Sequence, residues 1–551
     1  SAGFKTPNET VDWDKNPFFV PMESMKWNSN SETPLRAGIS AFGFGGTNFH
    51  IALESYDEAH HRDISNEWSQ RWLAYTGDLI PQNNLAIGDI NLENAEPSLT
   101  WNQLKEIEGG VLLINAPDVK EIKHKIEKIK SELSAIESNF DNSPDGVRLS
   151  EKLTSLSENF ECKDLRIAIV ATDWEGIFKK LDLAFENIDD ENKWGFLGSQ
   201  DVFITSREIS EEDKIAHLFP GQGSQYVGMT YDLSLRYGII GDTWDEADKT
   251  MAEILDGQKL SEFVLSSNLS KEERIAAELK LKQTEYTQPA MLTADLALHR
   301  LLEQHGQVPD MVAGHSLGEY AALMVSGILQ FHDALRAAAA RGTEMGSVDV
   351  PDKGLMASIT APYDQIEDIL YDLEGYVIPA NKNSPLMTVI AGETEGVNSA
   401  IEKFEELGIN CVLLPTSHAF HTRIVAPANE PLKRFLENLE INLPEIPITS
   451  NYDGEYYPSN CEEGFSINET ILPQLAPQMS SPVEWTRQIE NMYDDGAKIF
   501  VEVGPKRALT MFCGQILEEN EHNSIMTNRP KQGGIRSFLC SLGQLAILGQ
   551  N

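Results

Sequence analysis

Gly314-His315-Ser316-Leu317-Gly318-Glu319-Tyr320 is the stretch that decides the fold of this chain of 551 residues. It follows an apolar run at 311–313 and leads into residues 320–325, which favour a helix. A serine flanked by glycines between a strand and a helix is typical of a nucleophile elbow. Such a turn is so tight that only glycine fits beside the serine. The pattern predicts that the Ser316 hydroxyl projects from the end of a strand, next to a helix N-terminus. Short Gly/Ser turns after strands are common, so the motif is a moderate signal by itself.

Length and composition describe a globular protein with several cores. A chain this long predicts about three or four domains. No apolar run approaches the ~20 residues that a membrane span needs, and no basic-then-apolar signal segment opens the chain. The five cysteines are scattered without a Cys-x-x-Cys pair. They predict neither a disulfide framework nor a zinc site, and they fit a reducing cytoplasm. We therefore expect a cytoplasmic protein without a metal or a membrane partner.

The charge of the chain is unusual. It has 44 basic and 86 acidic residues, for a net charge of −42. This balance argues against nucleic acid or an anionic membrane as a partner, since both need basic surface. An anionic substrate must find a local positive site within a repulsive field.

Strands and helices alternate from residue 215 past residue 500, which predicts a mostly parallel sheet. Residues 354–415 interrupt it with an order of their own, strand-helix-strand-strand-helix-strand, which is the ferredoxin-like pattern. Their position between the elbow and the next motif predicts an inserted lid subdomain. Upstream, residues 60–212 predict a small α/β adaptor, with strands at 111–114 and 166–171 and a helix at 119–136. The chain ends in an apolar helix, predicted at 538–548.

Two features near the elbow carry chemistry, a candidate base and a candidate oxyanion hole. A serine needs a base to take its proton, and the candidate is His421, just after the last lid strand. Two histidines beside a strand end, His418 and His421, leave structural and catalytic roles about equally open. The loop at 220–223 (Pro-Gly-Gln-Gly) follows a strand. Its backbone N–H groups form one candidate arm of an oxyanion hole, and the N–H of Leu317 forms the other. The alternative, a phosphate cradle, lacks the Lys-Ser/Thr that closes a P-loop.

Arg341 lies in a predicted helix that follows the elbow, at 334–341. A guanidinium can hold a carboxylate through two parallel hydrogen bonds. From the residues alone, an arginine in such a helix is more often a surface residue.

Ordered motifs along the chain resemble a known family. They lie at 219–225, 314–320, 341–342, 380–385, 418–421 and 502–505. Together they resemble the acyltransferase domain of type I polyketide and fatty-acid synthases, and the stand-alone malonyl-CoA:acyl carrier protein transacylase. Residues 37–50, with Gly-Phe-Gly-Gly before a short strand, resemble the C-terminal end of a ketosynthase. That family's reactive Cys and catalytic His residues have no match here, which excludes condensation activity.

The resemblance implies an α/β fold, with an α/β-hydrolase-like parallel-sheet core, an inserted ferredoxin-like subdomain and a preceding small α/β linker domain. The implied domains are a ketosynthase remnant at 1–57, a linker at 58–212, an acyltransferase domain at 213–515 and a post-acyltransferase linker at 516–551. Within the acyltransferase domain, residues 213–350 and 417–515 form the large subdomain and residues 351–416 the small one.

The resemblance also assigns roles to residues. Ser316 is the nucleophile and His421 the general base and acid, while Gln222 and Leu317 match the oxyanion-hole positions. The remaining matches concern substrate and base: Arg341 grips a malonyl carboxylate, the backbone carbonyl of Gln478 orients the base, and Gln288 lines the cleft. His418 and Phe420 belong to a His-Ala-Phe-His motif that resembles the malonyl-selective version. There Phe420 fills the space that an α-methyl group would occupy.

The implied function is to load malonyl from malonyl-CoA onto the phosphopantetheine thiol of an acyl carrier protein, with no bound cofactor. The implied partners are that carrier protein and a ketosynthase domain of the same synthase, with no nucleic acid and no membrane. The chain itself is expected to be a monomer. Candidate basic clusters for carrier docking are Lys382, Arg423 and the group Arg529, Lys531 and Arg536.

Other functions predict different features. A serine hydrolase shares the elbow, but its usual order of Ser, Asp or Glu, then His has no carboxylate-binding arginine. A non-catalytic scaffold does not need the Ser316/His421 pair. A neutral acetyl donor leaves Arg341 unpaired, which is costly for a buried charge.

Overall fold

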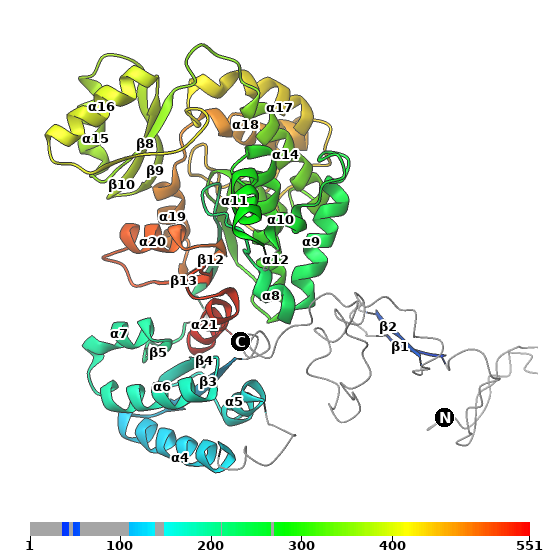
Figure 1. The fold of residues 1–551 in the computed structure, drawn as a ribbon, viewed down its shortest axis with the longest axis vertical. Coiled ribbons are helices and arrows are strands. Elements are labelled where there is room, and N and C mark those ends of the chain that lie inside the picture. Colours follow the sequence, from blue (N-terminus) through cyan, green and yellow to red (C-terminus); the bar gives the residue numbers. More distant parts are fainter. Residues whose placement is uncertain are drawn as a thin grey trace, which may run out of the picture. The chain divides into compact units, whose positions relative to one another are not determined.

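Figure 1 shows the chain as a computed structural model. The structure describes residues 109–137, 148–210, 212–265 and 269–550, together with the backbone of β1 (Arg36–Phe42) and β2 (Asn48–Glu54). The chain divides into two compact units, residues 1–82 and 83–551.

In the first unit, β1 and β2 pair antiparallel, with Arg36 opposite Glu54 and Phe42 opposite Asn48. The short strand expected after the Gly-Phe-Gly-Gly loop lies within β2. The loop itself and the rest of the predicted ketosynthase remnant (1–57) lie outside the described residues.

A parallel sheet forms the core of the second unit. Its strand order is β13-β12-β6-β7, and every neighbouring pair is parallel. The strands are β6 (Lys214–Phe219), β7 (Met311–Gly314), β12 (Ala497–Pro505) and β13 (Asn523–Asn528). Almost every residue of β7 and β12 is buried, as expected for parallel strands covered on both faces. The mostly parallel sheet predicted from the alternation of elements is confirmed.

Helices cover this sheet. Those described between β6 and β7 are α8 (Tyr231–Arg236), α9 (Gly238–Met251), α10 (Leu260–Val264), α11 (Lys271–Lys280) and α12 (Thr284–Gln304). After β7 come the 3-10 turn η4 (Ser316–Gly318), α13 (Glu319–Val325) and α14 (Phe331–Gly346). Helix α12 is buried on all sides because it packs between α9, α14 and β12. It therefore presents side chains to the interior along nearly its whole length.

The inserted subdomain has the ferredoxin-like order. Its elements are β8 (Leu355–Ile359), α15 (Tyr363–Tyr371), β9 (Val377–Ser384), β10 (Met387–Gly392), α16 (Thr394–Glu406) and β11 (Cys411–Leu413). The strands pair antiparallel in the order β11-β8-β10-β9. Ile359, Ile366 and Phe404 belong to a separate core, and Figure 1 shows this subdomain as a lobe of its own. The predicted strand-helix pattern is confirmed.

The chain then returns to the large subdomain. The elements that follow are η5 (Arg423–Ala428), α17 (Asn429–Leu436), α18 (Ile467–Leu475), η6 (Gln478–Ser480), α19 (Trp485–Asp494) and α20 (Ala508–Ile516). Residues 420–422 and 478–481 therefore lie in the part of the chain that follows the inserted subdomain.

The adaptor upstream is a small α/β layer. Its elements are β3 (Gly110–Ala116), α4 (Val119–Glu137), α5 (Leu149–Ser157), β4 (Leu165–Ala171), α6 (Trp174–Asn187), η3 (Glu191–Lys193), α7 (Trp194–Ser199) and β5 (Val202–Thr205). The strands pair antiparallel with β4 in the centre. The C-terminal helix α21 (Gly534–Ile547) packs against β3, β4 and β13. It begins four residues before the predicted start, because Asp232 accepts a hydrogen bond from the Ile535 amide in its first turn.

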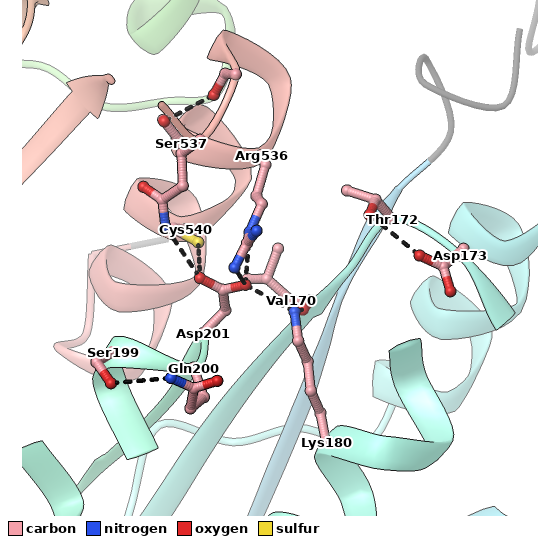
Figure 2. A network of polar contacts seen from close by, with 12 residues as sticks. Val170, Thr172, Asp173, Lys180, Ser199, Gln200, Asp201, Arg536, Ser537 and Cys540 are labelled. Atoms are coloured by element: carbon pink, nitrogen blue, oxygen red, sulfur yellow. Dashed lines mark hydrogen bonds and ion pairs between the residues drawn. The ribbon is translucent and has the colours of Figure 1, made fainter. Parts of the chain in front are cut away.

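Asp201, between α7 and β5, fastens α21 to this layer (Figure 2). Its carboxylate is fully buried. Oδ2 accepts from Lys180 Nζ at 2.7 Å and from Arg536 Nε at 2.7 Å, and Oδ1 accepts from Gln532 Nε2 at 3.1 Å. Because Arg536 is engaged here, it is not a free docking cation as the sequence suggested.

We expect Asp201→Ala to lower the free energy of unfolding by about 3 kcal/mol, because it leaves Lys180 and Arg536 without their shared carboxylate. Amide hydrogen exchange in α21 should accelerate more than exchange in α12. Glu175→Ala, which removes an exposed pair with Lys179 on α6, is the control and should change neither measurement. Unchanged protection of α21 in Asp201→Ala would contradict this account.

Candidate active site

The turn after β7 is as tight as the sequence suggests. Ser316 has a φ of +53°, a left-handed conformation that a non-glycine residue adopts only under constraint. A Cβ on Gly314 would lie 2.1 Å from the carbonyl carbon of Gly318. A Cβ on Gly318 would lie 2.0 Å from the carbonyl oxygen of Phe219. Both glycines are therefore required by the close approach of backbone to backbone.

Ser316 and His421 are in hydrogen-bond contact. Ser316 Oγ lies 2.7 Å from His421 Nε2. His421 Nδ1 lies 3.2 Å from the carbonyl oxygen of Gln478 and 3.1 Å from that of Ser481. Carbonyl oxygens only accept, so Nδ1 carries the proton and Nε2 is free to accept from the serine. The sequence pointed to the Gln478 carbonyl, and the structure places the Ser481 carbonyl beside it.

His421 sits in an environment that keeps it neutral. Burial, together with the neighbouring Arg341 and His315, lowers the pKa of His421 from 6.5 to about 3. The two backbone carbonyls oppose this shift but do not overcome it. A neutral imidazole at neutral pH is the form that can accept a proton from a hydroxyl.

Arg341, on α14, is buried beside Ser316 and His421. Its Nη1 donates to Gln288 Oε1 at 3.1 Å, and its Nε and Nη2 donate to Gln478 Oε1 at 3.3 and 3.2 Å. Nη2 also lies 3.4 Å from Ser316 Oγ. The expectation that such an arginine lies at the surface is therefore wrong for Arg341. Helix α14 packs along α12 and turns the side chain inward.

Asn451 holds the turn, although no pattern in the sequence indicates this role. Its Oδ1 accepts from the Ser316 amide at 2.7 Å, and its Nδ2 donates to the Gly314 carbonyl at 2.6 Å. Gln478 Nε2 donates to the Ser316 carbonyl at 2.6 Å. Asn451 follows a short bridge beside β7 that carries no periodic pattern, and no local signal links it to Ser316.

The carboxylate of Glu319 supports the same turn from inside the protein. Its Oε1 accepts from the Asn451 amide at 3.1 Å and from the Tyr457 hydroxyl at 2.8 Å. Burial raises the pKa of Glu319 to about 7, while these hydrogen bonds and Arg341 act in the opposite direction.

The loop that carries Gln222 lies against the elbow. A Cβ on Gly221 would come within 2.4 Å of the His315 carbonyl oxygen and 3.3 Å of the Leu317 amide nitrogen. The two backbone segments named as an oxyanion hole are thus neighbours in space. The Gln222 side chain itself is exposed.

The two histidines of the His-Ala-Phe-His motif have different partners: His421 contacts Ser316, and His418 contacts the backbone of Val348. His418 Nε2 lies 3.1 Å from the Val348 carbonyl oxygen, and its ring centroid lies 6.1 Å from that of Phe420. Both side chains are buried. Neither has a hydrogen bond to Ser316, His421 or Arg341 within the described part of the chain. Phe420 thus stands one residue before the base, and His418 anchors the segment to the backbone after α14.

Two further basic candidates have acidic partners. Lys382 pairs with Glu484 at 2.7 Å, and Arg423 pairs with Glu393 at 3.4 Å. In a chain with this excess of carboxylates, exposed cations readily find a neighbour. Among the described residues, no group of His, Cys, Asp and Glu is placed to hold a metal ion, and no helix is long and apolar enough to cross a membrane.

Comparison with known families gives two matches. The model described as "Acyl transferase domain" matches residues 216–551, more than half of the chain. The model described as "Ketoacyl-synthetase C-terminal extension" matches residues 7–80.

Individual relatives agree. A malonyl CoA-acyl carrier protein transacylase of Escherichia coli O157:H7 is 36% identical over 310 residues, which are 55% of this chain and 93% of that protein. One component of the polyunsaturated fatty acid synthase of a Thraustochytrium species is 27% identical over 94% of this chain, but the match spans only 17% of that protein. The crystal structure of a malonyl CoA-acyl carrier protein transacylase from Clostridium perfringens superposes with a TM-score of 0.53 at 29% identity. It covers 61% of this chain and all of that one.

We expect Asn451→Ala to slow labelling of Ser316 by a fluorophosphonate at least about tenfold. The change leaves the Ser316 amide and the Gly314 carbonyl buried without partners, at about 1–3 kcal/mol, so the serine leaves its constrained conformation. Thr449→Val is the control, because it breaks a buried hydrogen bond to Gln488 nearby without touching the elbow. Equal labelling rates in the two variants would show that Asn451 does not position the nucleophile.

Proposed function

The chain belongs to the acyl transferase domain family, and from this premise we propose that it loads malonyl from malonyl-CoA onto the phosphopantetheine thiol of an acyl carrier protein. The observation that carries the proposal is the position of Arg341. Its Nη2 lies 3.4 Å from Ser316 Oγ, the atom that would bear the acyl group. A buried guanidinium beside an activated serine suits a donor with a free carboxylate.

In the first half-reaction, Ser316 Oγ attacks the thioester carbonyl carbon of malonyl-CoA. The proton of Oγ passes to His421 Nε2, which is already within 2.7 Å. A carbon–oxygen bond forms, and the negative charge develops on the thioester oxygen, facing the N–H groups of Gln222 and Leu317. The carbon–sulfur bond then breaks, and His421 gives its proton to the departing sulfur of coenzyme A.

In the second half-reaction, the carrier thiol attacks the acyl-serine. His421 takes the thiol proton and later returns it to Ser316 Oγ, so the enzyme ends unchanged. The carbonyls of Gln478 and Ser481 hold the imidazole in one tautomer through both steps. No bound cofactor or metal enters this sequence.

Arg341 would hold the malonyl carboxylate through two parallel hydrogen bonds. Because Arg341 is buried, such a pair is much stronger than one at the surface. The local positive charge also offsets the repulsion that a chain of net charge −42 exerts on an anionic donor.

Phe420 would set the choice of extender unit. Its ring is buried, one residue before the base in the chain, and would fill the space that an α-methyl group requires. One methyl group changes binding by only ~1–3 kcal/mol, so malonyl is preferred over methylmalonyl without absolute exclusion.

The wider assembly is also a proposal, because the chain spans about a fifth of the synthases that it matches. We assign residues 1–57 to a ketosynthase remnant, 58–212 to the linker, 213–515 to the acyltransferase domain and 516–551 to the post-acyltransferase linker. The match of residues 7–80 to a ketoacyl-synthetase extension supports a ketosynthase in the same synthase. All five cysteines are free, which supports a reducing cytoplasm.

Incubation with malonyl-CoA should add one malonyl group to the intact protein, detected by mass spectrometry, and Ser316→Ala should abolish the adduct. Methylmalonyl-CoA and acetyl-CoA, tested separately, should add less. A preference for acetyl-CoA would contradict the role of Arg341 and keep the fold. No adduct with any donor, with slow release of coenzyme A, would favour a hydrolase or a scaffold.

The rate of the first acylation should not fall as the pH drops through 6.5. The base must be neutral, and its lowered pKa keeps it neutral well below the range of a free imidazole. The acid limb should therefore appear far below pH 6.5 in single-turnover release of coenzyme A. Burial raises the pKa of Glu319 to about 7, so this group could add a step of its own to the pH profile. The variant Glu319→Gln removes that step and serves as the control. A step near pH 6.5 that persists in Glu319→Gln would contradict the neutral, buried His421.

A further inference from the structure

Arg341 is a buried cation with neutral partners. Its guanidinium contacts the amide oxygens of Gln288 and Gln478 and the hydroxyl of Ser316. Within the described residues the structure gives it no ion pair. Buried charges in proteins are normally paired with an opposite charge, because a charge that leaves water without such a partner is strongly destabilising. Three uncharged oxygens around a buried guanidinium therefore call for an explanation.

The neighbouring carboxylate, Glu319, forms no ion pair with Arg341 in the described part of the chain. Glu319 directs its Oε1 toward Asn451 and Tyr457. Its Oε2 has no hydrogen-bond partner in the described part of the chain. Burial raises the pKa of Glu319 to about 7, so near neutral pH a large fraction of this group carries no charge.

The side-chain oxygen of Gln288 accepts a hydrogen bond from Arg341. Gln288 is fully buried in α12, and its Oε1 accepts from Arg341 Nη1. An arginine only donates, so the amide must turn its oxygen toward the guanidinium. Its Nε2 then faces the sulfur of Met345 at 3.7 Å, which is a weak acceptor. The amide thus gives up a good partner for its nitrogen in order to present its oxygen to Arg341.

We infer that Gln288 and Gln478 form a neutral amide cage, which satisfies the N–H groups of Arg341 but leaves its positive charge for the carboxylate of the acyl donor. This inference rests on the proposed function, and it makes Gln288 a specificity-determining residue. The amides hold the guanidinium in place through hydrogen bonds. They do not compete with a carboxylate as an internal glutamate would.

The cage explains discrimination between donors of similar size. A malonyl chain brings a carboxylate directly to Arg341 and so gives this buried cation a charged hydrogen-bond partner. An acetyl chain brings none, and the hydrogen-bond partners of the guanidinium stay uncharged. Replacing one amide by a carboxylate of the same shape would remove this difference.

Gln288 is the residue to change, because Gln478 also contacts Ser316 and His421. Gln288→Glu keeps the shape of the side chain and puts a carboxylate oxygen where the amide oxygen now lies, 3.1 Å from Arg341 Nη1. We expect kcat/KM for self-acylation with malonyl-CoA to fall about 10- to 100-fold, mainly through KM. The value for acetyl-CoA should hold or rise, so the malonyl/acetyl ratio falls by at least about tenfold.

Two companion variants separate charge from structure. Gln288→Met removes the acceptor without adding a charge, so both donors should slow while the ratio stays within about threefold. Gln488→Glu puts a carboxylate at another fully buried glutamine, in α19. Gln488 accepts a hydrogen bond from Thr449 and has none with Arg341 in the described part of the chain. This variant should leave the malonyl/acetyl ratio unchanged whatever it does to stability.

The outcomes distinguish this inference from the proposed function. If the wild-type protein forms no malonyl adduct, the proposed function fails. If it does, and Gln288→Glu keeps the wild-type ratio, the amide cage is overturned and the proposed function stands. Should Gln288→Glu fail to fold, Gln288→Met decides the question. A malonyl/acetyl ratio that falls at least about tenfold in Gln288→Met would overturn the inference, because the amide itself, and not its neutrality, would then select the donor.

Discussion

The site depends on the two side-chain amides that hold the backbone of Ser316 in a left-handed conformation. Such a conformation costs a non-glycine residue on the order of 1 kcal/mol or more, and it persists only where the surroundings impose it. Asn451 accepts from the Ser316 amide, and Gln478 donates to its carbonyl, so both backbone groups of the serine are held. Gly314 allows the end of the strand to approach the backbone of Gly318, and Gly318 allows the turn to approach the backbone of Phe219. The hydroxyl direction is thus fixed before any donor arrives.

Gln478 is where the separate parts of the site meet. Its backbone carbonyl accepts from His421, its side-chain nitrogen donates to Ser316, and its side-chain oxygen accepts from Arg341. The residue lies in η6, after the inserted subdomain has returned the chain to the parallel sheet. A small displacement there would move the base, the nucleophile and the arginine together. The insertion of a whole subdomain between β7 and β12 is therefore compatible with a precise site, because one residue after it carries all three contacts.

The sequence predicted those parts that have a local pattern. The elbow has its glycines, the strands their apolar runs, and residues 354–415 the alternation of a ferredoxin-like unit. The pairing of His421 with Ser316 followed from the resemblance, since spacing alone left its role open. Asn451 and Ser481 were missed because they act through contacts between segments far apart in the chain, and such contacts leave no periodicity. The hydrogen bonds from Arg536 and Gln532 to Asp201 also join segments far apart in the chain, and no local pattern predicts them. The burial of Arg341 was not predictable from its own helix either, because it depends on how α14 packs along α12.

The positive charge of Arg341 acts at the site, although the net charge of the chain is negative. The net charge of −42 repels an anionic donor at a distance, and salt screens that repulsion beyond about 10 Å. Lys382, Arg423 and Arg536 are each paired with a carboxylate and add little attraction. Arg341 differs because its partners are amides and a hydroxyl, and because burial removes the water that would weaken its field. A carboxylate that reaches it exchanges hydration for a charged partner, whereas a neutral chain gains only contact. Selection for a carboxylated donor therefore depends on keeping the direct hydrogen-bond partners of one arginine uncharged, and an acidic chain does this with glutamines, which have nearly the shape of glutamate.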